Sequence, residues 1–229
     1  MIRKFTAFIL LAMLSLAALP AQAELWTFED QYTHWNGWGT HHENKKDVIG
    51  IPDFTDGTAT VVNNTLQSVR FFFSAGSSES LYNQLGSGDL FVNTDNDSSW
   101  NYLVRLNNDL TADVYNFNTS YTDRGAYYLG HADGDYRDYH PAWGKVWGDA
   151  LYSGTWSGKP EFPGEGNVGV ISIAGLNIDF DKLSLSYTVS CANDIMGADT
   201  FSKTPIPGAV WLLGSGLLGL IGLRRRQKG

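Results

Sequence analysis

The stretch Leu183-Ser-Leu-Ser-Tyr-Thr-Val-Ser-Cys191 decides the fold class of this chain. Apolar side chains occupy every second position from Leu183 to Cys191, and serine or threonine fills the positions between them. This alternation has the two-residue period of a β-strand, in which successive side chains point to opposite faces. We therefore predict a strand with one apolar face. Cys191, the single cysteine of the chain, is predicted to lie on that face as a buried thiol without a disulfide partner in the chain.

Shorter segments of the same character lie upstream of this stretch. They are rich in β-branched and aromatic residues, which favour strands, and clusters of Gly, Asn, Asp and Ser separate them as turns. The predicted strands cover residues 25–28, 58–62, 66–73, 89–92, 100–106, 110–117, 125–129 and 168–174. No convincing helical periodicity appears between residues 24 and 203. The pattern predicts an all-β domain, an antiparallel β-sandwich of jelly-roll-like form, in which residues 130–166 form a long surface loop.

Residues 1–23 have the composition of a secretory signal peptide. Arg3 and Lys4 form its positive start, residues 5–19 are apolar, and Ala21-Gln-Ala23 is an A-x-A cleavage motif. Signal peptidase would then release a mature chain that begins at Glu24. An uncleaved anchor is the alternative, and the small residues Ala21 and Ala23 argue against it.

The C-terminal segment, residues 204–229, is built like a membrane tail. Its apolar part, residues 209–223, carries no charge and is followed directly by Arg224, Arg225 and Arg226. At ~1.5 Å rise per residue this run is short for a hydrocarbon core of ~30 Å, but the preceding Pro-Ile-Pro-Gly turn makes it long enough to span marginally. We predict a single transmembrane helix at about residues 206–223. Residues 224–228 are its cytoplasmic end, because basic clusters stay on that side.

The order of the parts in this tail resembles a known sorting signal. Pro205-Ile-Pro207-Gly208, an apolar run that starts Ala-Val-Trp-Leu-Leu-Gly-Ser-Gly-Leu, and Leu-Arg-Arg-Arg together resemble the PEP-CTERM signal, most closely its VPLPA variant. Thr204 stands where that variant has Val, and Gly208 where it has Ala. The resemblance implies that a membrane protease of the exosortase type cuts at the proline motif. A permanent anchor without cleavage is the alternative.

The two chain ends together predict a route through the cell. They imply export through the inner membrane of a Gram-negative bacterium as a membrane-anchored precursor, with the mature form at the cell surface or outside the cell. Two motifs of the predicted domain are also similar to those of PEP-CTERM cargo proteins. The first is Gly88-Asp-Leu-Phe-Val92 with a following acidic loop and Trp100, and the second is Thr188-Val-Ser-Cys-Ala-Asn-Asp194. This resemblance implies a fold and a location, and no particular activity.

The part between residues 24 and 203 is one domain by size, and it is strongly acidic. It holds all 24 acidic residues of the chain but ten of the sixteen basic residues, so that its net charge is −14. Such a surface repels nucleic acid and attracts divalent cations. We therefore expect no nucleic-acid partner.

The acidic loop before Trp100 is the first candidate site. Asn93, Asp95, Asp97 and Ser99 bear oxygen atoms at every second position, and Ca²⁺ takes about six to eight oxygen ligands. These residues can supply a structural calcium site. An acidic hairpin turn is the alternative, because Asn and Asp favour turn conformations without any ion. Thermal melts in calcium and in EDTA distinguish the two, since a bound ion raises the melting temperature.

Aromatic residues make up 14% of the chain and indicate a second candidate site. Trp143, Trp147 and Trp156 lie in the predicted long loop, where indole rings can stack on the apolar faces of sugars. Packing inside a domain that has no disulfide to hold its loops is the alternative role of the same rings.

Motifs for catalysis are missing from the sequence. It has no G-x-S-x-G elbow, no H-E-x-x-H zinc motif and no phosphate-binding glycine loop. The sequence therefore predicts a non-enzymatic protein. Together with the predicted export and the aromatic side chains, we expect it to lie in the envelope or extracellular matrix and to associate with exopolysaccharide in a biofilm. A secreted glycan-active enzyme, such as a glycosidase with a lectin-like fold, and a purely structural surface-coat protein are the alternatives. No cofactor apart from calcium is expected.

Overall fold

The computed structural model of the chain describes residues 23–31, 35, 53–74, 86–132, 135–158, 168–190 and 194–205. Most of these residues lie in β-strands, and the one helical segment among them is the 3-10 turn η1 (Arg124–Ala126). All the strand pairs that they form are antiparallel. This confirms the all-β, antiparallel class that the sequence predicts.

Thirteen strands follow one another along the described residues. They are β1 (Ala23–Glu29), β2 (Asp53–Val62), β3 (Thr65–Ser74), β4 (Ser87–Asn93), β5 (Ser99–Leu106), β6 (Thr111–Ser120), β7 (Tyr127–Ala132), β8 (Asp135–Gly144), β9 (Tyr152–Ser157), β10 (Val168–Asp179), β11 (Ser184–Val189), β12 (Ile195–Ala198) and β13 (Ser202–Pro205). Eleven form one sheet in the order β12-β11-β4-β5-β6-β9-β10-β3-β2-β1-β13, and β7 and β8 form a separate hairpin. Turn residues set these connections. Asn63 and Asn64 join β2 to β3 with φ of 50° and 59°, which asparagine tolerates.

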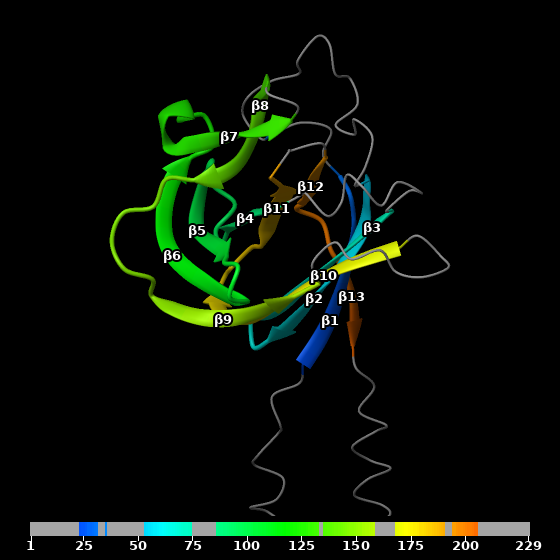
Figure 1. Cartoon of the computed structure of the whole chain (residues 1–229). Coiled ribbons are helices and arrows are strands. Elements are labelled where there is room, and N and C mark those ends of the chain that lie inside the picture. Colours follow the sequence, from blue (N-terminus) through cyan, green and yellow to red (C-terminus); the bar gives the residue numbers. More distant parts are fainter. Residues whose placement is uncertain are drawn as a thin grey trace, which may run out of the picture.

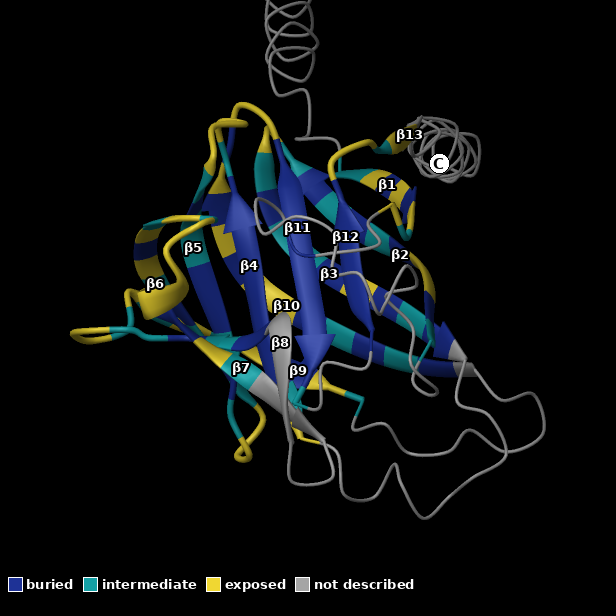
Figure 2. Ribbon diagram, turned by 90° about the horizontal axis from the view of Figure 1, so that it is seen from above, coloured by how far each residue is buried: buried dark blue, intermediate teal, exposed yellow. Residues whose placement is uncertain are grey.

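The eleven-stranded sheet curls so that its two halves face each other (Figures 1 and 2). One half runs from β12 to β6, the other from β10 to β13, and β9 joins them. The main core fills the space between the halves. Phe71 of β3 stacks on Tyr187 of β11 with ring centroids 4.9 Å apart, and Phe54 of β2 meets the same ring at 5.6 Å. Burial of these aromatic rings holds the two halves together.

Hydrogen bonds also fasten the β12 edge to the other half of the sheet. The carboxylate of the fully buried Asp194, just before β12, accepts a hydrogen bond from the backbone N–H of Phe54 in β2. The backbone N–H of Gly197 donates to an Asp30 carboxylate oxygen at 3.0 Å. The N–H of Gln31 donates to the Gly197 carbonyl oxygen at 2.9 Å. These bonds connect β12 with β2 and with the chain that follows β1, although they are distant in the strand order.

A second core lies on the outer face of β4, β5 and β6. The β7–β8 hairpin lies against this side of the sheet (Figure 2). Trp35, Phe91, Trp100 and Tyr127 pack there in edge-to-face or tilted contacts, with ring centroids 4.9 to 5.9 Å apart. Consequently β4 is buried on both of its faces.

The prediction of a long surface loop over residues 130–166 is wrong. The end of β7, the whole of β8 and the whole of β9 lie within this range. β8 packs on β4 and β11, and β9 joins the two halves of the sheet. Glycine, proline and charged residues in these strands weaken their local propensity, so that pairing and burial place them instead.

The strand predicted from the alternation of residues 183–191 is confirmed as β11, with one difference. Leu185, Tyr187 and Val189 belong to the main core, as the alternation predicts. The serine and threonine face of the strand is buried too, because β8 packs against β4 and β11. Cys191 lies outside the described residues, so its burial stays a prediction.

The first and last described strands lie side by side. β1 pairs with β13 in a register that sets Glu24 opposite Pro205 and Trp26 opposite Lys203. The Lys203 ammonium group lies 4.3 Å from the centre of the Trp26 ring, a cation–π contact. Ala23, the expected end of the signal peptide, is the first residue of β1.

Other residues of the two predicted targeting segments fall outside the described ranges. These are Ala21, Pro207, Gly208, Arg224, Arg225 and Arg226, together with the predicted transmembrane helix at 206–223. Within the described ranges, no helix has the length and apolar character needed to cross a membrane.

Candidate functional site

The acidic loop that the sequence singles out joins β4 to β5. The side-chain oxygen of the buried Asn93 accepts hydrogen bonds from the backbone N–H groups of Asp95 (3.0 Å) and Asn96 (2.7 Å). Asp95 Oδ1 accepts from the N–H of Asp97 at 3.2 Å, and Asp97 Oδ1 accepts from the N–H of Ser99 at 2.7 Å. The four predicted calcium ligands are therefore linked in a series of side-chain-to-backbone turns, in which Ser99 takes part only through its backbone N–H.

Neighbouring residues fix this loop further. Asn93 Nδ2 donates to the Asp97 carbonyl oxygen at 2.8 Å and to the Tyr121 hydroxyl. Burial raises the pKa of Tyr121 to about 12, although its bond with Asn93 acts in the opposite direction. Among the described residues, no three His, Cys, Asp or Glu side chains form a group that could hold a metal ion. Calcium binding by the loop stays a prediction beside the plain acidic turn.

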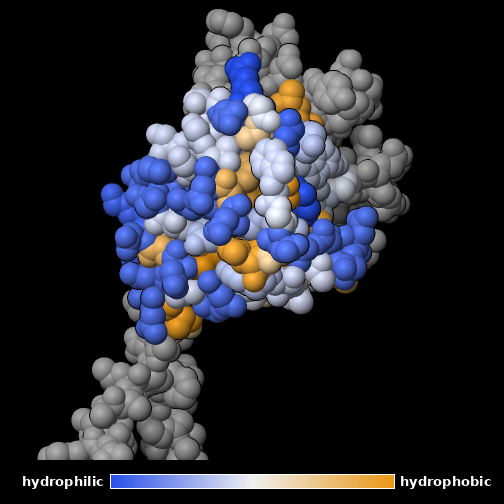
Figure 3. Space-filling model, turned by 90° about the vertical axis from the view of Figure 1, so that its left-hand side faces the viewer, coloured by the Kyte–Doolittle hydropathy of each residue, from blue (hydrophilic) through white to orange (hydrophobic). Residues whose placement is uncertain are grey.

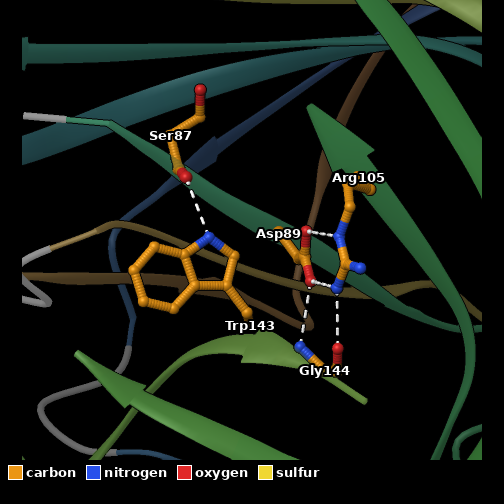
Figure 4. Close-up of polar contacts among 5 residues, drawn as sticks. All are labelled: Ser87, Asp89, Arg105, Trp143 and Gly144. Carbon is orange, nitrogen blue, oxygen red and sulfur yellow. Dashed lines mark hydrogen bonds and ion pairs between the residues drawn. The ribbon is translucent and has the colours of Figure 1, made fainter. Parts of the chain in front are cut away.

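The Gly88–Val92 motif holds β4 between neighbouring strands. A Cβ atom on Gly88 would lie 2.5 Å from the Thr188 carbonyl oxygen and 2.7 Å from that of Ala142, so the close approach requires glycine. Asp89, the next residue, is fully buried. Arg105 of β5 binds it with two hydrogen bonds, from Nε at 3.1 Å and from Nη2 at 2.8 Å (Figure 4).

Gly144 of β8 completes this ion-pair cluster (Figure 4). Its N–H donates to Asp89 Oδ2 at 2.9 Å, and its carbonyl oxygen accepts from Arg105 Nη2 at 2.7 Å. The adjacent Trp143 donates from Nε1 to the Ser87 carbonyl oxygen at 3.1 Å. Burial raises the pKa of Asp89, and the Arg105 guanidinium and the Gly144 N–H partly offset that effect. These bonds hold β8 against β4 and β5, so the Gly88–Val92 motif has a structural role.

The three predicted sugar-binding tryptophans have different surroundings. Trp147 is 78% exposed in the connection between β8 and β9, whereas Trp156 of β9 is 6% exposed and belongs to the main core. Trp143 is half-buried through its contact with Ser87. No ring contact joins the three, all of which are described, so the structure does not assemble them into one platform. Figure 3 views the side that carries β6 and shows small apolar areas within a largely hydrophilic surface.

A polar groove of about 660 Å³ lies where β1, β2 and the start of β13 meet. Glu29 and Asp56 line this groove and are opposite each other in the β1–β2 register. Directly paired residues have Cβ atoms ~4.5–5.5 Å apart. Hydroxyl groups of Thr27, Thr58 and Ser202 line the same groove. It can therefore offer two neighbouring carboxylates and several hydroxyls to a polar ligand.

Comparisons with protein-family models, with curated proteins and with solved structures found no match. A functional assignment therefore rests on the sequence motifs and on the geometry of the described residues.

Sequence reasoning missed the groove and the ion-pair cluster. Glu29 and Asp56 come from strands with a long connection between them, and a single sequence carries no signal of their pairing. The sequence did contain a signal for the Asp89 cluster. A carboxylate inside the apolar strand Gly88–Val92 must be paired when it is buried, which calls for a cation such as Arg105.

Proposed function

We propose that this protein is an exported, non-enzymatic component of the bacterial envelope or extracellular matrix, and that its β-domain binds exopolysaccharide. In this proposal residues 1–23 direct export, and an exosortase-type protease acts on the 204–229 tail at its proline motif. The finer fold assignment belongs to the same proposal. A core enclosed between two facing halves of a curled antiparallel sheet supports a jelly-roll-like β-sandwich.

The exposed ring of Trp147 is the observation that carries the binding role. Gly148, with φ of 94° and open space around it, and the exposed Asp149 follow it in the same connection. An indole beside a carboxylate suits a sugar, because the apolar sugar face packs on the ring while the carboxylate accepts bonds from hydroxyls. The fully buried carboxylates Asp89 and Asp194 take part in structural hydrogen bonds, so neither is accessible to a substrate.

Replacement of Trp147 with alanine tests the binding role. We expect the full-length Trp147→Ala variant to co-sediment with the extracellular polysaccharide of its host at least about tenfold more weakly than wild type, because a central aromatic contact is lost. Its melting temperature should not change, since the ring is exposed. Leu151→Ala, which alters another exposed residue of the same connection, is the matched control and should bind normally. Equal binding by Trp147→Ala and wild type would remove this ring from the site.

Intact-mass measurement of the protein from its native host tests the processing part of the proposal. We expect a mature form that begins at Glu24 and ends between Thr204 and Pro207, because the expected cut points lie at the outer ends of β1 and β13. Recovery of a form that still carries Arg224 to Lys228, with no shorter product, would indicate a permanent anchor.

A glycan-active enzyme is the second candidate, and the groove favours it. Glu29 and Asp56 are directly paired, which allows the ~5–5.5 Å separation of carboxyl groups that retaining glycosidases use. The release of reducing ends from the host polysaccharide by wild type, and its loss in Glu29→Gln, would support the enzyme and overturn the non-enzymatic proposal.

A further inference from the structure

A second hollow, of about 420 Å³, lies at the bend where β9 joins the two halves of the sheet. Its apolar lining comes from Leu110, Trp156 and Ala174, and four serine or threonine hydroxyls surround it. Asp109 supplies the one charged group among its lining residues. The volume falls within the ~300–1,000 Å³ of small-molecule sites, and the mixed lining matches a ligand with both an apolar face and hydroxyl groups.

Leu110 has an unexpected backbone conformation at the rim of this hollow. Six non-glycine residues of the described chain have positive φ; the other five are asparagine, and Leu110 is the sixth, with φ of 68°. Asparagine tolerates this region, whereas a bulky side chain adopts it at a cost. The turn is nevertheless well formed, because the Leu110 N–H donates to the Asn107 carbonyl oxygen at 3.0 Å.

Core packing does not explain a leucine at this position. Its side chain is 46% exposed and belongs to neither hydrophobic core. Leucine is thus unfavourable for the backbone conformation and is not buried in the folded domain. Strained residues that persist in a fold often mark functional sites. We take the apolar surface of Leu110 to be the reason that leucine is present here.

The residues around Leu110 are held in place by the same turn. Trp156 donates from its backbone N–H to the Leu110 carbonyl oxygen at 3.0 Å and from Nε1 to the Asn107 carbonyl oxygen at 2.7 Å. Asp109 Oδ1 accepts from the Thr111 N–H at 3.0 Å and from the Thr111 hydroxyl at 2.7 Å. These bonds lower the pKa of Asp109, so the carboxylate is charged at neutral pH. Among the described residues that line the hollow none is basic, and Arg70 of β3, outside the lining, donates from Nε to the Ser172 hydroxyl at 3.2 Å.

We infer that this hollow is a subsite for a neutral hexose ring of a polysaccharide. The apolar face of the ring packs on Leu110 and reaches only the small exposed edge of Trp156, while the surrounding hydroxyls and Asp109 bond to the sugar hydroxyls. The inference rests on the proposed polysaccharide-binding function and adds a location and a charge preference to it. Uronic-acid polymers are disfavoured, because their carboxylates would meet Asp109 within the lining, whereas Arg70 lies outside it and already bonds to Ser172.

The test uses the full chain in gels that contain dextran, galactomannan or a β-glucan, with alginate as the anionic comparator. We expect at least one neutral polymer to retard wild type, and Leu110→Asn to bind that polymer about tenfold more weakly. The same variant should melt about 2 to 4 °C higher, because asparagine relieves the backbone strain. Opposite effects on affinity and on stability separate loss of a contact from loss of the fold.

Leu151→Asn is the matched control, because Leu151 has a similar exposure of 48% and no positive φ. It should change neither the retardation nor the melting temperature. Wild-type affinity in Leu110→Asn, or retardation by alginate as strong as by the neutral polymers, would overturn the inference. If Trp147→Ala loses binding while Leu110→Asn retains it, this subsite is wrong and the proposed function stands. If no polymer of the panel retards wild type and the host polysaccharide does not bind, both fail.

Discussion

Asp89 lies in β4, the third strand from the β12 end of the sheet, and its polar partners Arg105 and Gly144 come from different strands. Arg105 approaches from β5 and Gly144 from β8, so one carboxylate joins three strands. A buried carboxylate is costly unless charges and hydrogen bonds surround it. The cluster is therefore more sensitive to the loss of one member than to the loss of the whole group.

Replacement of Arg105 with methionine tests this sensitivity. The loss of one partner of a buried ion pair costs about 3–5 kcal/mol, and because 30% of the Arg105 side chain is exposed we expect roughly 2–4 kcal/mol less unfolding free energy in urea denaturation at about pH 7. The double variant Asp89→Leu/Arg105→Met should recover much of that loss, since no unpaired charge remains. Similar stability of the single and double variants would show that the pair is not coupled.

The pH dependence of this loss has a defined sign. Burial raises the pKa of Asp89 above its unfolded value, so the folded state holds the proton more tightly than the unfolded state does. The contribution of Asp89 to the free energy of unfolding is therefore most favourable below the pKa that Asp89 has in the unfolded chain. It declines as the pH rises through the pKa of Asp89 in the folded state. The loss of unfolding free energy caused by Arg105→Met should accordingly be smaller at about pH 4 than at about pH 7.

At the level of single residues, the sequence identified residue types but not their exposure. It indicated three tryptophans for sugar binding. In the structure Trp156 is buried, Trp143 is half-buried and Trp147 is exposed to solvent. All three occur in similar glycine-rich surroundings, and burial depends on which strand pairs with which. Leu110 looked like the start of a strand, and its positive φ follows from the turn that precedes β6.

Among the elements, β4 and β8 depend on close contact between backbones. A Cβ atom on Gly88 would meet two backbone carbonyl oxygens within 2.7 Å, and backbone atoms cannot move aside as a side chain can. A Cβ atom on Gly86, two residues earlier in the sequence, would have the side chain of Ser190 as its nearest neighbour, at 3.6 Å. The two glycines therefore form a natural pair for comparison.

We expect Gly88→Ala to destabilise the protein by about 1–3 kcal/mol, the usual cost of overpacking, and Gly86→Ala to have little effect. Thermal melts of the two full-length variants give the comparison. Hydrogen exchange should show greater opening of β8 in Gly88→Ala, because the Ala142 carbonyl oxygen is one of the atoms that the new methyl group meets. Equal melting temperatures for the two variants would contradict this account of the motif.

Strands with strong alternation were predictable, and strands placed by their partners were not. Residues 66–73, 100–106 and 183–191 carry enough β-branched, aromatic or alternating residues to mark β3, β5 and β11 from sequence alone. β8 and β12 gain their stability from contacts with β4 and β11, which a local pattern does not reveal. The acidic loop was located correctly, but its turn hydrogen bonds depend on the buried position of Asn93.

For the molecule as a whole, buried phenols make alkaline conditions destabilising. Burial raises the pKa values of Tyr121 and Tyr152 to about 12 and raises those of Tyr127 and Tyr187 as well. An unfolded tyrosine titrates near pH 10, so the folded state keeps protons that the unfolded state releases. Stability should therefore be present below about pH 10 and be lost as the pH rises toward about 12.

An alkaline titration followed by tyrosinate absorbance and by circular dichroism checks this expectation. The tyrosinate absorbance of accessible tyrosines should appear near pH 10. That of the buried tyrosines should appear at higher pH, together with the loss of the strand signal in circular dichroism. Tyr121→Phe should lower the absorbance of the buried tyrosines and leave that of the accessible tyrosines unchanged. A complete absorbance change before any loss of strand signal would show that the phenols are accessible in the folded protein.

The β1–β13 pairing would have a mechanical consequence for a chain that is anchored, as proposed, through its C-terminal tail. Force applied beyond Pro205 enters the domain through β13, whose register with β1 extends from Ser202 to Pro205. A pull along the axis of β13 would load the hydrogen bonds of this short strand together, in shear, and would not open them one after another. The cation–π contact of Lys203 with Trp26 shares that load. A surface-bound domain under flow would thus resist detachment at its shortest terminal strand, and the rest of the curled sheet would bear little tension.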